Sequence, residues 1–279
     1  MTSAITRGIS IYKEKGAITL LQRTLRKIHR DVYCKSMSVR GRYSFTLADH
    51  TITFSAPTPT VVKRNRSRFK SEKQELADFI NEIKEGDVVY DVGANTGLYT
   101  LFAAKACPDG EVIAFEPYPP NLDLLKQDVA RNQLQNVEIV DVALSDSVGN
   151  IEFSQPSEDD VGYGSSSIEA DESEATIEVP TTTGDQLIAD GEIPAPNVIK
   201  IDVEGSEPLV LEGLEKALSA PSCRTVYCEV HLPGLDLRPS VEDFGSSAED
   251  IENRLREFGF TVERLHSSRG SEIFYKAKK

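Results

Sequence analysis

Short apolar runs alternate with segments of helical periodicity along residues 71–279. Runs that are rich in β-branched residues and bounded by Gly, Pro or Asp predict buried strands. These runs are residues 88–90, 111–116, 137–142, 197–202 and 225–230. Apolar residues at i, i+3 and i+4 predict helices over residues 71–83, 98–106, 120–131, 207–218 and 248–258. Because strands and helices alternate, we expect parallel strands with right-handed crossovers, and therefore an α/β fold.

The alternation changes near residue 150, where no helix follows the third strand. Residues 151–153 and 176–179 predict two short strands around an acidic loop, rich in Ser and Gly, at residues 158–174. This loop is either a lid or a solvated surface excursion. We therefore expect a β insertion at about residues 150–183.

The two ends of the predicted domain also carry clear signals. Ser71 and Gln74 have the spacing of a capping box, which predicts the start of the first helix. Residues 260–265 and 272–275 predict a terminal antiparallel hairpin. The domain is accordingly expected to span residues 71–279.

Residues 1–70 form a separate N-terminal extension. Residues 4–30 combine apolar and basic positions at helical spacing, and residues 43–54 predict a β-hairpin. The basic helix is expected either to dock on the acidic domain or to lie on an anionic membrane surface. The basic run at residues 63–70 is either solvated or an anion-contacting lip of the active site. No aromatic interleaving accompanies it, so we expect no nucleic-acid partner.

Charge separates the two parts of the chain. Residues 1–70 carry a net charge of +12 and residues 71–279 a net charge of −26, within a total of −14. Such a dense acidic surface is typical of proteins from halophilic organisms, which is the source we expect; an ordinary acidic enzyme is the alternative. The basic part predicts an anionic partner of its own.

The four cysteines form no C-x-x-C pair, and no His lies at metal-ligand spacing beside them. Free thiols in a reducing compartment are the expectation. The N-terminus lacks the apolar region of a signal peptide, and the chain has no run of about 18 apolar residues. We expect a cytoplasmic protein, free or peripheral at the inner membrane face.

A glycine turn between the first strand and its helix supplies the clearest chemical signal. Asp91 ends the strand and Gly93-Ala94-Asn95-Thr96-Gly97 leads into the helix, while Glu116 ends the next strand. Dinucleotide dehydrogenases use G-x-G-x-x-G around a pyrophosphate, and this turn lacks that spacing. Asp91 would repel a pyrophosphate, whereas it suits a cationic ligand such as S-adenosylmethionine.

Each part of S-adenosylmethionine has a predicted contact. The amides of the turn and Thr96 meet its carboxylate, and Asp91 receives its ammonium group. Glu116, followed by Pro117, accepts the ribose hydroxyls. Asp141 addresses the adenine edge together with the amides of Val142 and Ala143, and Asp202 lies beside the methyl group.

Five motifs resemble those of the FkbM family of S-adenosylmethionine-dependent methyltransferases: DVGANTGLYT, FEPYPPN, VALSD, KIDVEGSEPLVLEG and CEVH. The resemblance covers roughly residues 71–275. It implies a class I methyltransferase fold, which is a Rossmann-like, mostly parallel seven-stranded sheet with an antiparallel terminal hairpin. It also implies methylation of hydroxyl groups of sugars or of polyketide-type natural products.

Three residues at the ends of the fourth and fifth strands are catalytic candidates: Asp202, Glu204 and His231. An alcohol needs a base during methylation, and an unperturbed imidazole titrates near pH ~6.5, so His231 is the candidate base. The alternative is that His231 orients the substrate or caps the strand. The three side chains also resemble a Mg²⁺ site with too few oxygen ligands, so we expect no metal.

The combined prediction is an enzyme that methylates an oxygen of a sugar in a glycan or glycolipid. Carboxyl methylation of a uronic acid, which needs no base, and methylation of a natural product remain alternatives. A binding module with a vestigial donor site is the non-enzymatic alternative.

Overall fold

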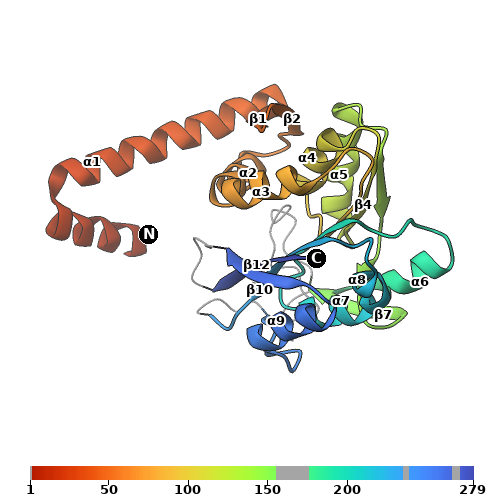
Figure 1. Ribbon diagram of the computed structural model, residues 1–279. Coiled ribbons are helices and arrows are strands. Elements are labelled where there is room, and N and C mark those ends of the chain that lie inside the picture. The colour runs from red at the N-terminus through yellow and green to blue at the C-terminus, as the bar shows by residue number, and fades with distance from the viewer. Residues whose placement is uncertain (1, 155–175, 235–238, 266–270) are drawn as a thin grey trace.

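The computed structural model describes residues 2–154, 176–234, 239–265 and 271–279. Its centre is a seven-stranded sheet with the order β11-β12-β10-β9-β3-β4-β5 (Figure 1). The strands are β3 (Val88–Val92), β4 (Glu111–Phe115), β5 (Val137–Val140), β9 (Val198–Ile201), β10 (Thr225–His231), β11 (Thr261–Leu265) and β12 (Glu272–Lys278). Only β12 runs antiparallel to its neighbours, β10 and β11. The expected α/β fold with an antiparallel terminal hairpin is therefore confirmed.

Both faces of this sheet are covered. Successive residues of β3 belong to two apolar clusters, Val89 to one and Tyr90 and Val92 to the other, because side chains alternate along a strand. The Val89 face packs against α3 (Lys73–Glu82) and α4 (Leu98–Ala106). The opposite face packs against α7 (Glu207–Gly213), α8 (Glu215–Ser219) and α9 (Ala248–Glu257). Burial on both sides explains why these strands are continuous apolar runs.

The order of the strands creates one crevice. From β3 the chain passes through α4, β4 and α5 (Pro119–Arg131) to β5, and then returns to the other side of β3 as β9. In open α/β sheets ligands bind outside the carboxyl ends of the strands where the order reverses. The carboxyl ends of β3 and β9 are therefore where the site is expected.

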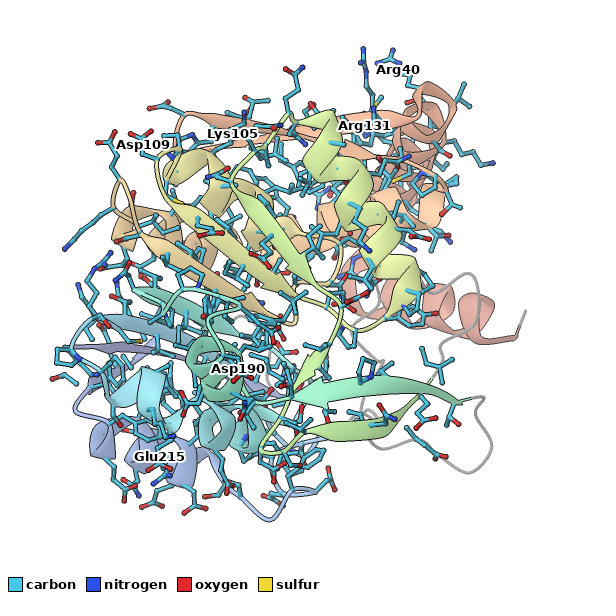
Figure 2. All side chains as sticks on the ribbon, turned by 90° about the vertical axis from the view of Figure 1, so that its right-hand side faces the viewer. Arg40, Lys105, Asp109, Arg131, Asp190 and Glu215 are labelled. Carbon is cyan, nitrogen blue, oxygen red and sulfur yellow. The ribbon has the colours of Figure 1, made fainter. Side chains whose placement is uncertain are left out.

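The N-terminal extension packs on this domain through its hairpin. It consists of α1 (Thr2–Arg40), β1 (Arg42–Leu47), β2 (His50–Ser55) and α2 (Pro59–Ser71). Phe45 of the hairpin stacks on Phe69 with ring centroids 4.2 Å apart, and Phe69 in turn lies 6.2 Å from Phe102 of α4. Figure 2 shows Arg131 at the end of α5 near this hairpin, and its Nε donates to Ser55 Oγ at 3.3 Å.

The long helix α1 projects from the body towards its N-terminus (Figure 1). Near its C-terminal end Cys34 is buried in the same apolar cluster as Phe45 and Phe54 of the hairpin. Farther back, Leu21, Leu25, Ile28 and Val32 are exposed although they are apolar. No helix among the described residues is long and apolar enough to cross a membrane.

The insertion forms a small sheet of its own, with the order β6-β8-β7. Its strands are β6 (Ala143–Leu144), β7 (Gly149–Ser154) and β8 (Thr176–Thr182). The acidic loop at residues 158–174 lies outside the described residues. After β8 the chain enters α6 (Gly184–Ala189), where the Thr183 hydroxyl accepts a hydrogen bond from the amide of Gln186 and caps the helix.

Two helix boundaries differ from expectation. The predicted capping box at Ser71 is wrong, because Ser71 ends α2 and its hydroxyl donates to the carbonyls of Ser67 and Arg68. The residue that precedes α3 is Glu72, whose side chain makes no capping bond. The helix predicted over residues 207–218 is divided into α7 and α8 at Leu214.

Candidate active site

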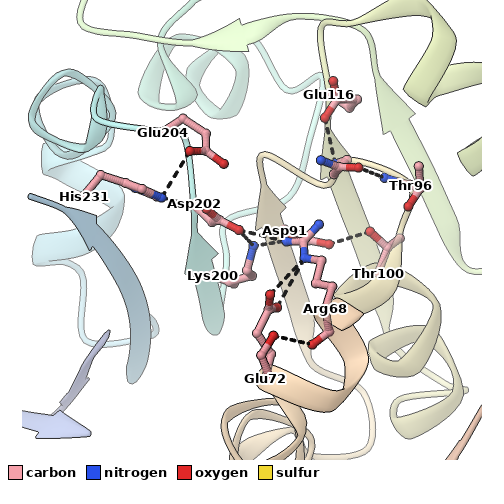
Figure 3. Close-up of polar contacts among 12 residues, drawn as sticks. Arg68, Glu72, Asp91, Thr96, Thr100, Glu116, Lys200, Asp202, Glu204 and His231 are labelled. Carbon is pink, nitrogen blue, oxygen red and sulfur yellow. Dashed lines mark hydrogen bonds and ion pairs between the residues drawn. The ribbon is translucent and has the colours of Figure 1, made fainter. Parts of the chain in front are cut away.

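Asp91 lies at the carboxyl end of β3 and is fully buried. Its Oδ2 accepts a hydrogen bond from Thr100 Oγ1 at 2.6 Å (Figure 3). Its Oδ1 accepts no hydrogen bond from the described residues, but it lies 3.7 Å from Lys200 Nζ. The chain therefore places one positive charge of its own beside this carboxylate and leaves one acceptor oxygen free.

Lys200 is a lysine within the apolar strand β9, and its side chain is 1% exposed. Its ammonium group donates to Asp202 Oδ2 at 2.9 Å. Burial alone would lower the pKa of Lys200, but the carboxylates of Asp202 and Asp91 raise it above its usual value. A buried lysine of this kind holds the two strand-terminal carboxylates together.

Asp202 follows β9 and also accepts a hydrogen bond from Arg68 of the N-terminal extension. Arg68 Nη2 donates to Asp202 Oδ2 at 2.8 Å, while Arg68 Nε contacts Glu72 at 3.2 Å (Figure 3). Burial would raise the pKa of Asp202, but Lys200 and Arg68 hold it well below its usual range. Asp202 is therefore ionised at neutral pH, and α2 forms one wall of the site.

The glycine turn fits closely against the end of β9. Gly93 has φ +79°, and a Cβ there would lie 1.9 Å from the carbonyl oxygen of Asp202. Gly97 has φ +85° and begins α4. Asn95 between them also has a positive φ, and its amide donates to Glu116 Oε2 at 2.7 Å. Only glycine avoids both the steric clash and the backbone strain at Gly93.

Glu116 ends β4 and is buried beside this turn. Its Oε1 accepts the amide of Tyr118 at 2.9 Å, and Oε2 accepts the amide of Asn95. Burial raises the pKa of Glu116 to about 7, despite these hydrogen bonds to the carboxylate. Asn121 Nδ2 also donates to Oε1, at 3.4 Å, so the lone pair that remains for a further donor is on Oε2.

His231 ends β10 and is surrounded by carboxylates. Its Nδ1 lies 2.8 Å from Glu207 Oε1, and its Nε2 lies 3.3 Å from Glu204 Oε2 and 3.9 Å from Asp202 Oδ1. Burial would lower the pKa of His231, but Glu207, Glu204 and Asp202 raise it well above its usual value. The imidazole is therefore protonated at neutral pH, which departs from the unperturbed imidazole assumed from the sequence.

The structure brings most of the predicted site residues to one edge of the sheet. Asp202, Glu204 and His231 form a cluster (Figure 3), and the backbone of Asp202 lies against Gly93 of the turn. Glu229 lies close to this cluster. One carboxylate oxygen of Asp202, one of Glu229 and one ring nitrogen of His231 all lie within 4.8 Å of one another.

The remaining predicted residues extend the same edge towards β5. Pro117 follows Glu116 and is half-buried, and Ala94 is buried within the turn. Asp141 is exposed after β5, Val142 is half-buried, and Ala143 begins β6. The contacts of Asp141, Val142 and Ala143 with the adenine ring stay predictions, as do those of Ala94 and Pro117 with the rest of the donor.

The comparison with protein families decides the identity of this arrangement. The family model described as "Methyltransferase FkbM domain" matches residues 91–262, which is more than half of the chain. The chain belongs to the FkbM methyltransferase family. The FkbM match begins at Asp91 and ends in β11, so it includes every predicted catalytic residue.

Two similar proteins are methyltransferases by name. Hexuronic acid methyltransferase AglP of Haloferax volcanii is 30% identical over 197 residues, which cover 71% of this chain and 77% of AglP. The 31-O-demethyl-FK506 methyltransferase FkbM of Streptomyces tacrolimicus is 29% identical over 208 residues, which cover 65% of this chain and 75% of that protein. Among solved structures, a SAM-dependent methyltransferase from Aquifex aeolicus aligns with TM-score 0.46 and 16% identity, over 78% of this chain and 97% of that chain.

As a member of the FkbM family, the chain is an S-adenosylmethionine-dependent methyltransferase. The residues at the edge of the sheet fit this donor. The unpaired Oδ1 of the buried Asp91 can accept a hydrogen bond, and the spare lone pair of Glu116 Oε2 can accept a hydroxyl donor. The amides of the turn, residues 93–97, donate to acceptors within the protein, and the Thr96 hydroxyl donates to Asn65 Oδ1 at 3.3 Å. The predicted contact of this turn with the donor carboxylate stays a prediction and requires these groups to exchange partners.

Several residues of the candidate active site were not predicted from the sequence. Lys200 is a charged residue inside an apolar strand, which was a visible but unused signal. Glu207 and Glu229 approach His231 only through the fold. Arg68 belongs to the basic run that was predicted to be either solvated or a lip of the site, and it reaches Asp202.

Proposed function

We propose that this methyltransferase transfers the methyl group of S-adenosylmethionine to an oxygen atom of a sugar. The observation that carries the proposal is the cluster of His231, Glu204 and Asp202 beside the donor turn. Polar groups that face a bound methyl donor suit an oxygen nucleophile and the hydroxyls around it. The name of the relative AglP, a hexuronic acid methyltransferase, supports a sugar acceptor.

The donor supplies a methyl group on a positively charged sulfur. Asp91 and Glu116 would hold it, because Asp91 Oδ1 and the remaining lone pair of Glu116 Oε2 can still accept hydrogen bonds. Asp202 is kept ionised by Lys200 and Arg68, so it would place a permanent negative charge at the same edge. This charge favours binding of a cationic donor.

The acceptor oxygen must become more nucleophilic as the new oxygen–carbon bond forms. For a hydroxyl acceptor a base takes the proton, and in this site His231 is protonated at neutral pH. His231 would serve as the base only after it loses its proton, which the neighbouring Glu204 and Glu207 oppose. A hydroxyl acceptor therefore predicts a rate that rises with pH.

A carboxylate acceptor is the second candidate, and the raised pKa of His231 favours it. A carboxylate carries its negative charge already and needs no base. To reach the imidazolium of His231, such an acceptor would have to displace Glu204 from Nε2, because Nδ1 faces Glu207. The reaction would then form a methyl ester on a uronic acid, with a rate nearly independent of pH around neutrality.

The experiment uses methyl-labelled S-adenosylmethionine and a matched pair of acceptors, a glucoside and the corresponding glucuronide. Label on the glucoside that survives mild alkali is a methyl ether and identifies hydroxyl methylation. Label on the glucuronide that alkali releases is a methyl ester and identifies carboxyl methylation. If the purified protein binds the donor but labels neither sugar nor a cell extract of glycans, the sugar acceptor is wrong and the vestigial module is favoured.

Location at a membrane is a further part of this proposal. The exposed apolar side chains of Leu21, Leu25, Ile28 and Val32 on α1 support peripheral contact with lipid. Deletion of residues 1–35 should lower sedimentation with anionic vesicles and leave donor binding intact. Equal sedimentation of the truncated and full chains would contradict this contact.

A further inference from the structure

A basic groove with a volume of about 720 Å³ lies between α1 and α2, outside the cluster around His231. On α1 it is lined by Leu25 and His29 together with four cations, Arg23, Arg26, Lys27 and Arg30. Their spacing is i, i+3, i+4 and i+7, which places all four on one face of the helix. This face points towards α2, and of the exposed apolar residues of α1 Leu25 also borders the groove.

The facing side of α2 repeats the same pattern. Lys63, Arg66, Ser67 and Lys70 line the groove and again have the spacing i, i+3, i+4 and i+7. The guanidinium of Arg66 lies over the ring of Tyr33, 4.4 Å from its centroid, so this cation is held in place. Two stripes of like charge therefore face each other across one groove.

Such an arrangement needs a counter-charge. Among the described residues that line the groove none carries a carboxylate, and Arg30 pairs with its neighbour Asp31 at 3.4 Å. Like charges on facing helices repel each other, and elsewhere this acidic chain offers many carboxylates. An anion that enters between the helices would relieve this repulsion from both sides.

We infer that the groove binds a phosphate or diphosphate group of the acceptor. Guanidinium groups form paired hydrogen bonds with phosphate oxygens, and a diphosphate has enough charge for several lysines and arginines at once. This inference deepens the proposed function and rests on it, because the ligand of the groove is identified as the sugar acceptor. The acceptor would be a sugar joined through phosphate to a carrier, which is either a lipid or a nucleoside.

The position of α2 connects the groove with the reacting edge. Ser67 and Lys70 face the groove, while Arg68, between them in sequence, reaches Asp202 at 2.8 Å. The two sites thus lie on different sides of one helix, whose diameter with side chains is about 10–12 Å. An acceptor held by its phosphate would extend past α2 to present its sugar to Asp202 and His231.

The test is a calorimetric titration of the full chain with inorganic pyrophosphate and, separately, with S-adenosylmethionine. The triple variant Lys63→Gln, Arg66→Gln and Lys70→Gln should bind pyrophosphate roughly tenfold more weakly, because three charged contacts are lost. Its affinity for S-adenosylmethionine should stay unchanged, which shows that the variant is folded. Wild-type binding should also weaken as salt is raised.

A matched control removes the same charges elsewhere. It carries the exposed substitutions Lys126→Gln, Lys216→Gln and Arg256→Gln. The control should bind pyrophosphate like the wild type. Equal weakening in both variants, or none in the groove variant, overturns the inference. If the wild type binds pyrophosphate but not S-adenosylmethionine, the result contradicts the donor site and still supports anion binding by the groove.

Two further probes identify the source of the phosphate. Binding of uridine diphosphate that depends on the groove residues assigns a nucleoside carrier. Binding to phosphatidylcholine vesicles that contain a polyprenyl phosphate, again lost in the groove variant, assigns a lipid carrier. Failure of both probes, or tighter groove-dependent binding of RNA than of pyrophosphate, overturns the acceptor role.

Discussion

Replacement of Lys200 by Met removes the one buried ammonium group that joins the ends of β3 and β9. Lys200 Nζ lies 2.9 Å from Asp202 Oδ2 and 3.7 Å from Asp91 Oδ1, and its side chain is 1% exposed. At an effective dielectric constant of about 20, each attraction amounts to about 4–6 kcal/mol. The variant also avoids the desolvation cost of burying the lysine charge, and this cancels part of the lost attraction. Loss of one partner from a buried ionic cluster costs about 3–5 kcal/mol in net stability, which is the decrease we expect.

The pH dependence distinguishes this electrostatic cause from lost packing. In the wild type the pKa of Asp202 is depressed, so its contribution to stability is full above the unfolded pKa of about 4 and is lost as pH falls. The variant lacks Lys200, the main positive neighbour of Asp202, so the pKa of Asp202 is less depressed there. The difference in unfolding free energy between wild type and variant should therefore shrink only as pH falls below about 4, the unfolded pKa.

The assay is equilibrium unfolding in urea at several pH values. Lys126→Met, on an exposed face of α5, is the matched control and should change stability by less than about 0.5 kcal/mol. A decrease for Lys200→Met of less than about 1 kcal/mol, or one that does not vary with pH, would refute the role assigned to this lysine.

Two other substitutions test neighbouring parts of the site. Gly93→Ala places a Cβ 1.9 Å from the Asp202 carbonyl oxygen at φ +79°, so thermal unfolding should show at least about 2 kcal/mol of destabilisation; an unchanged melting temperature would contradict the close approach. Glu207→Gln removes the main carboxylate partner of His231, so an NMR titration should show a lower imidazole pKa. The stability gained from the raised pKa of His231 is full below about pH 6.5 and is lost as pH rises through the folded value, so this loss should begin at lower pH in the variant. An imidazole pKa equal to that of the wild type would contradict the assignment.

The architecture of the domain was accessible from the sequence because local patterns carry it. Runs such as residues 197–202 have strand character on their own, and alternation with helices restricts the sheet to few topologies. The ends of parallel strands share one edge, so Asp202 and His231 could be expected together. Their proximity, with Nε2 and Oδ1 3.9 Å apart, agrees with that expectation.

The electrostatic environment was not accessible in the same way. The contacts of Arg68 with Asp202 and of Arg224 with Asp87 join residues more than 130 positions apart, and no periodicity encodes such pairs. The ionisation of His231 depends on Glu207, which reaches it only because α7 begins beside the end of β10. Chemical roles inferred from unperturbed pKa values therefore needed correction once burial and neighbours were known.

The most direct test of the methyltransferase account is calorimetric titration with S-adenosylmethionine, with NADH as the comparison ligand and Glu116→Ala as the variant. The account predicts that the wild type binds S-adenosylmethionine and not NADH. It also predicts that loss of the Glu116 carboxylate weakens donor binding by roughly tenfold or more, because a hydrogen bond to the donor and the bond that holds the Asn95 amide are removed together. Absence of S-adenosylmethionine binding by the folded wild type, or tighter binding of NADH, would contradict the central claim.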